Sequence, residues 1–79
     1  PKRSSLSYSH FNMMHQEIQQ QIQENVESLL KGSPETLKAL ATRAHEAEQN
    51  VAYFLKLGDK GRVRYEMCQF LHWLKKYKN

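Results

Sequence analysis

Cys68 and His72 come closest, by residue type and spacing, to a motif that could do chemistry. They stand four residues apart, so a helix would place the thiol and the imidazole on one face. A structural zinc ion needs four such ligands, and the other histidines (His10, His15 and His45) stand at no spacing typical of metal ligands. A cysteine–histidine nucleophile needs a pocket that excludes water, and small helical bundles rarely have one. The sequence therefore predicts no catalytic, cofactor or metal site, and a protein that is not an enzyme.

Positive charge is concentrated near the carboxyl end of the chain. Residues 56–79 hold seven bases and two acids, whereas residues 5–55 hold three bases and six acids. If the apolar residues of the last segment turn inward, a helical wheel places bases and aromatic side chains on its outer surface and flank. These candidate partner-binding residues are Arg64, Tyr65, His72, Trp73, Lys75 and Lys76.

Three interpretations of this basic and aromatic surface remain open. Tyrosine, tryptophan and arginine are the usual anchors of protein interfaces, so the first hypothesis is a small regulator or adaptor that binds an acidic surface of another protein. Bases also contact phosphates and aromatic rings stack on nucleobases, so the alternative is a nucleic-acid-binding regulator that uses this segment together with Lys2 and Arg3. The third interpretation is a face that contacts only solvent, where bases near the carboxyl end favour the helix dipole.

Three segments must position these residues, and each repeats apolar side chains at steps of three and four, the period of an amphipathic helix. They run from about residue 8 to 31, from about 34 to 57 and from about 60 to 77. The apolar stripe of the third segment comprises Val63, Met67, Phe70, Leu71, Leu74 and Tyr77.

Turn residues separate the three segments. Gly32 and Gly58 suit helix ends, while Ser33 and Pro34 provide an N-cap and a first helical position for the second segment. Connections of about two residues require neighbouring helices to be antiparallel. The sequence thus predicts an all-α fold, a small three-helix up-down-up bundle in which the first two helices form a long hairpin.

Residues 37–54 resemble the helix-turn-helix family of DNA-binding motifs in spacing. Ala41 stands where that pattern has a small residue, and Val51 stands at its later apolar position. His45 and Glu46 occupy the places of the turn glycine and of the next apolar residue. Because alanine, glutamate and glutamine all propagate a helix, we predict one uninterrupted helix here.

Polar and exposed side chains on the first two segments identify a second candidate surface. His15 lies only about 40° from the centre of the first apolar stripe, which predicts a half-buried, hydrogen-bonded imidazole. Glu48 interrupts the second apolar stripe, and Tyr53 falls on the opposite face. A carboxylate within an apolar stripe must reach solvent, a base or a partner, so we expect Glu48 and Tyr53 to report on self-association into a homo-oligomer.

Length and composition bound the remaining possibilities. A chain of 79 residues with a net charge of +4 makes at most one small domain. We predict a flexible basic arm over residues 1–7 and a single helical domain over residues 8–79. The sequence has no apolar run of membrane-spanning length and no signal-peptide pattern, which predicts a cytoplasmic protein with no membrane partner.

Overall fold

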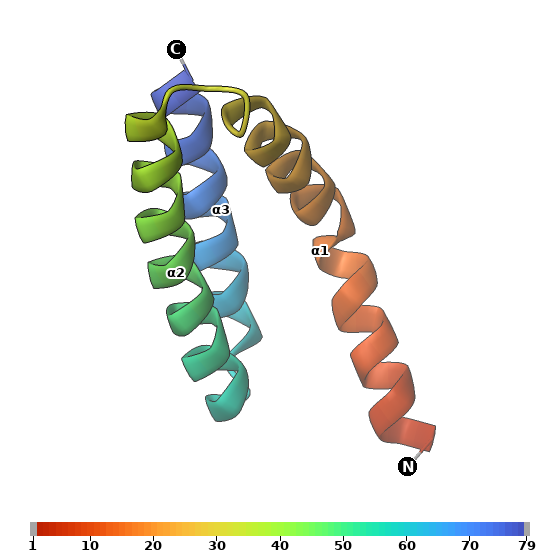
Figure 1. Cartoon of the computed structure of the whole chain (residues 1–79). Helices are drawn as coiled ribbons and strands as arrows, with labels where there is room; N and C mark the ends of the chain where they lie inside the picture. Colours follow the sequence, from red (N-terminus) through yellow and green to blue (C-terminus); the bar gives the residue numbers. More distant parts are fainter. Residues whose placement is uncertain (1, 79) are drawn as a thin grey trace.

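Three α-helices make up the fold: α1 (Lys2–Leu29), α2 (Pro34–Leu57) and α3 (Lys60–Lys78). The computed structural model describes the backbone of residues 2–78 and the side chains of residues 15–78. Consecutive helices run in opposite directions, as the colours from red to blue show in Figure 1. The predicted all-α class and the up-down-up order of its three helices are therefore confirmed.

The start of α1 differs from the sequence-based expectation. The helix begins at Lys2 rather than near Tyr8, so its backbone includes residues 2–7, whereas the flexible basic arm over residues 1–7 stays a prediction. The segment contains no glycine or proline that would interrupt a helix. The lack of apolar periodicity in this segment indicates that it has no apolar face to bury, but it does not prevent a helical backbone. The assignment of residues 8–79 to a single domain stays a prediction.

The ends of α2 are set by the turn residues that the sequence singled out. The Ser33 hydroxyl accepts a hydrogen bond from the backbone N–H of Thr36 at 3.3 Å, as an N-cap does. Gly58 ends the helix with a left-handed φ of 73°, a conformation that glycine adopts without steric cost. Between these caps the helix is continuous, which confirms the uninterrupted helix across residues 37–54.

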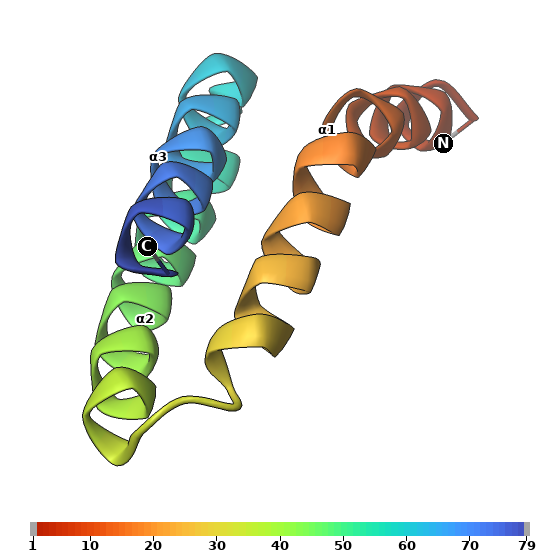
Figure 2. The same cartoon turned by 90° about the horizontal axis from the view of Figure 1, so that it is seen from above.

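The third helix lies between the other two. Both α1 and α2 pack extensively against α3, but they contact each other much less. They approach one another at the turn that joins them and then diverge, so that α1 leads away from α2 toward its own amino terminus (Figure 1 and Figure 2). The predicted hairpin is present as a chain reversal, yet its two helices are held together mainly through α3.

The buried core forms near this turn, where all three helices meet. Leu74 is completely buried there, and Phe70 one turn earlier on α3 is 8% exposed. Trp73 is half-buried and packs against the core. Tyr77, which we predicted in the apolar stripe of α3, is exposed. The buried members of the cluster are Leu29, Leu40, Ala47, Phe70 and Leu74.

Candidate functional site

The exposed side of α3, which borders α1 along one edge, carries five of the six residues that we predicted to bind a partner. We call Arg64, Tyr65, His72, Lys75 and Lys76 the outer face of α3; all five side chains are exposed. Tyr65 supplies the aromatic ring of this face, with 61% of its surface accessible. The structure therefore brings bases and one aromatic ring together on a single side of the molecule.

Acidic side chains of this region lie at the borders of the outer face. Glu66, the only acid of α3, accepts a hydrogen bond from the Asn50 amide of α2 at 2.9 Å. Asp59 precedes the helix, accepts the backbone N–H of Arg62 at 3.1 Å and pairs with the Arg62 side chain at 3.6 Å. The outer face itself therefore carries bases and no carboxylate.

The outer face reaches α1 along one edge. The Lys75 ammonium donates a hydrogen bond to the side-chain oxygen of Gln21 at 3.3 Å. Leu71, which lies four residues before Lys75 and hence on the same side of the helix, is buried. One edge of the outer face thus contacts α1, while its lysine and arginine side chains remain exposed.

Trp73 belongs to a different surface from the other five residues. Its indole stacks against the Phe70 ring, with ring centroids 6.4 Å apart, and makes a tilted contact with the Tyr77 ring at 5.0 Å. It is half-buried and turned toward α2. We predicted Trp73 beside the basic residues because the helical wheel puts it on the flank of α3. In the structure α2 packs against that flank, so Trp73 faces α2.

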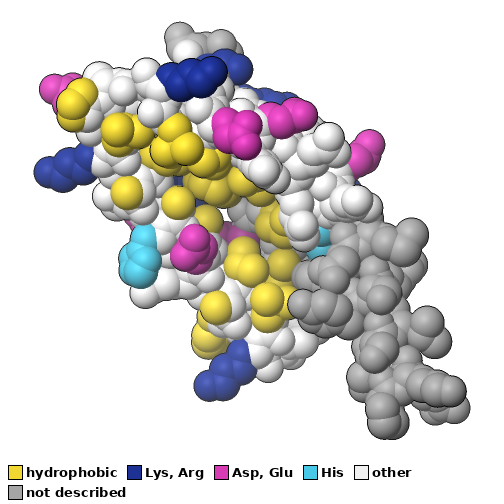
Figure 3. Space-filling model, turned by 45° about the vertical axis from the view of Figure 1, so that its right-hand side comes forward, with side chains coloured by type: hydrophobic (Ala, Val, Ile, Leu, Met, Phe, Trp, Pro, Cys, Tyr) yellow, Lys and Arg dark blue, Asp and Glu magenta, His cyan; other side chains and the backbone are white. Residues whose placement is uncertain are grey.

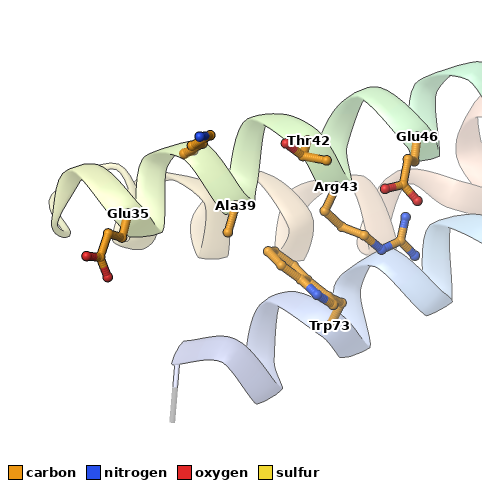
Figure 4. Close-up of a pocket in the computed structure, with 7 residues that line it drawn as sticks. Glu35, Ala39, Thr42, Arg43, Glu46 and Trp73 are labelled. Carbon is orange, nitrogen blue, oxygen red and sulfur yellow. The ribbon is translucent and has the colours of Figure 1, made fainter.

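A shallow groove between α2 and α3 surrounds Trp73 (Figure 4). Its volume is about 480 Å³, and it is lined by both positive and negative side chains of α2. The Arg43 guanidinium extends toward α3 and lies 5.6 Å from the Phe70 ring centroid, in cation–π contact. Glu35 and Glu46 stand at the two ends of the groove. With charges of both signs around one indole, this groove complements no single ionic class of ligand.

Glu48 and Tyr53, the predicted reporters of self-association, lie on different faces of α2. Glu48 is exposed and lines an apolar cleft between α1 and α2. Tyr53 is 59% exposed, makes an edge-on contact with Phe54 at 5.6 Å, and does not line that cleft. The structure therefore does not bring the two residues together.

Cys68 and His72 share one side of α3, as their spacing predicts. The Cys68 thiol is free and half-buried, and the His72 imidazole is exposed. Over the described residues, no group of three or more histidine, cysteine, aspartate and glutamate side chains is placed to hold a metal ion. The side chains of residues 1–14, including His10 and the bases Lys2 and Arg3, lie outside the described residues.

His15 is more deeply buried than its position on the wheel indicates. None of its surface is accessible, although we predicted a half-buried side chain. Burial lowers the pKa of the imidazole below its ordinary value of 6.5, and the positive charge of Arg64 lowers this pKa further. The apolar stripe of α1 indicates that His15 points inward. The proximity of Arg64 to His15 depends on the packing of α3 against α1, which the sequence of α1 does not show.

The lowered pKa of His15 predicts a protein that loses stability on mild acidification. The unfolded chain binds the proton more readily than the folded chain, so the stability contributed by neutral His15 is complete above pH 6.5 and falls as the pH drops below that value. Each unit of lowering corresponds to ~1.4 kcal/mol. Urea unfolding measured from pH 8 to pH 5 should show this decline, and His15→Gln should flatten it. His72→Gln, at an exposed position, serves as the matched control; a decline unchanged in His15→Gln would contradict the assignment.

Comparison with known proteins adds no functional information. No family model matches the chain, and neither the curated proteins nor the solved structures contain a significant match. Among the helices of residues 2–78, none has a stretch that is long and apolar enough to cross a membrane.

Proposed function

We propose that the protein is a non-enzymatic interaction module, a small regulator or adaptor that binds an acidic surface of another protein through the outer face of α3. The observation that supports this proposal is a row of exposed bases along one side of α3, with Tyr65 near its start, while Glu66, the only acid of the helix, is hydrogen-bonded to α2. Charged residues at such a surface steer association and select the partner, while Tyr65 and Arg64 are of the types that carry binding energy. A cytoplasmic location stays a prediction.

Charge reversal on the outer face tests the proposal. We expect the variant Lys75→Glu/Lys76→Glu to lose about tenfold or more of the affinity for a poly-L-glutamate probe, because two attractions become repulsions. The control variant Lys31→Glu/Lys56→Glu changes net charge by the same amount at exposed positions outside this face and should lose much less. Fluorescence anisotropy of the labelled probe measures both. Equal losses in the two variants would show attraction to net charge alone and contradict the proposal.

Nucleic acid is the second candidate, because the same exposed bases and the Tyr65 ring suit phosphates and nucleobases. Binding of duplex DNA should then weaken with salt at a log–log slope of about −0.9 for each phosphate contact. A gel-shift assay at low salt decides between the candidates. Binding of DNA that is tighter than that of poly-L-glutamate and is lost in Lys75→Glu/Lys76→Glu would favour this alternative; no shift would exclude it.

A further inference from the structure

An apolar cleft between α1 and α2 forms a second surface, on the opposite side of α3 from the outer face. Its volume is about 410 Å³, within the range of about 300–1,000 Å³ that is typical of ligand sites. Val63, Met67 and Phe70 of α3 form its floor, Ile22 of α1 lines one wall and Val51 of α2 lines the other. Figure 3 shows hydrophobic side chains gathered on both sides of this hollow.

The shape of the cleft fits a helix. Its walls are two helices that diverge from their shared turn, and its floor is a third helix (Figure 1). A further helix laid in this position would complete a four-helix arrangement, in which each helix packs on its neighbours. Three alanines of α2 line the cleft and allow the backbone of such a helix to approach closely; they are Ala44, Ala47 and Ala52.

One carboxylate indicates which helix the cleft would select. Glu48 is the only charged side chain that lines it among the described residues, and no base accompanies it. A second copy of this chain, docked symmetrically, would bring a second Glu48 to the same interface, where two carboxylates without a base repel each other. A helix of a different protein that presents lysine or arginine here would instead pair with Glu48.

We propose that the cleft binds an amphipathic helix of another protein, with an apolar stripe that packs on α2 and α3 and one basic residue that pairs with Glu48. This mode of recognition places an apolar helix face in an apolar groove. The cleft and the outer face of α3 point in different directions, so both can be occupied together. The inference is independent of the function proposed above, and together the two surfaces would let one small protein join two partners.

Two designed peptides test the charge selection. Both are amphipathic helices with leucine and alanine on one face; one carries lysine at the centre of that face and its twin carries glutamate. We expect the full chain to prefer the lysine peptide by about two- to fivefold, the range of exposed ion pairs, and Glu48→Lys to reverse the preference. Glu46→Lys makes the same charge change on the groove side of α2 and should leave the preference unchanged. Equal effects of the two substitutions would overturn the role of Glu48.

A second pair of variants locates the binding site. Ala52→Gln adds a longer polar side chain to the cleft wall at an exposed position, and we expect it to weaken binding of the lysine peptide by about tenfold. Ala41→Gln, at an exposed position that does not line the cleft, should bind as the parent does. No binding at millimolar peptide, or equal binding by both variants, would overturn the proposal. So would a dimer in solution that Ala52→Gln dissociates, because a second copy would then cover the cleft.

Discussion

Leu74→Ala is expected to lower the free energy of unfolding by about 2–5 kcal/mol, the cost of removing a buried leucine and leaving a cavity. The Leu74 side chain has no accessible surface and belongs to the cluster that joins all three helices. Domains have roughly 0.05–0.15 kcal/mol of stability for each residue, so a chain of 79 residues has about 4–12 kcal/mol in total. The substitution should therefore remove between about a sixth and all of the stability of the chain.

Urea unfolding followed by circular dichroism at the helix band measures this loss. Leu57→Ala is the matched control, since Leu57 is 61% exposed near the end of α2, and exposed substitutions of this kind change stability by only about 0.5 kcal/mol. If the two variants unfolded at the same urea concentration, Leu74 would not be the centre of the core.

Phe70→Ala should cost about 3–5 kcal/mol, the range observed for buried aromatic residues. The Phe70 ring contacts the guanidinium of Arg43 and the indole of Trp73, so its removal takes away one aromatic contact from each, while Trp73 keeps its contact with Tyr77. It also forms part of the cleft floor between α1 and α2. We expect Trp73 fluorescence to shift to longer wavelength in the folded variant, because the indole gains contact with water.

Phe70→Leu separates burial from aromatic contact. A leucine fills most of the volume, and substitutions between large apolar residues usually cost less than about 1.5 kcal/mol. The difference between Phe70→Leu and Phe70→Ala in urea unfolding therefore measures filling of the core. Cation–π contact of the buried Phe70 ring with the half-buried Arg43, worth about 0.5–2 kcal/mol, should disappear in both. A loss in Phe70→Leu as large as that in Phe70→Ala would contradict this division.

The positions of the helices could be predicted from the sequence, because the residues that begin and end a helix act locally. The cap of Ser33, the proline after it and the glycine at position 58 define the ends of α2 within a few residues. The packing order could not be predicted in the same way. An apolar stripe shows which side of a helix is buried, but not which neighbouring helix covers it. Leu71 and Phe70, for example, are both buried, but they lie on different sides of α3.

For the candidate site, too, the sequence predicts which side chains are exposed but not which helices lie beside them. A helical wheel placed Arg64, Tyr65 and Lys75 outside the core of α3, and the structure finds them exposed. The wheel could not assign Trp73, because a residue a quarter-turn from the core joins whichever helix packs against that edge. The cleft beside Glu48 depends on the divergence of α1 from α2, a long-range feature that no local pattern encodes.

Nuclear magnetic resonance of the isotope-labelled full chain, titrated with poly-L-glutamate, tests the central claim most directly. The claim is that α1 and α2 leave the outer face of α3 open for an acidic partner. The account predicts that the largest amide shifts fall on Arg64, Tyr65, His72, Lys75 and Lys76 and saturate together. Shifts centred on Lys31 or Lys56 instead, or no saturable shifts at low salt, would contradict it.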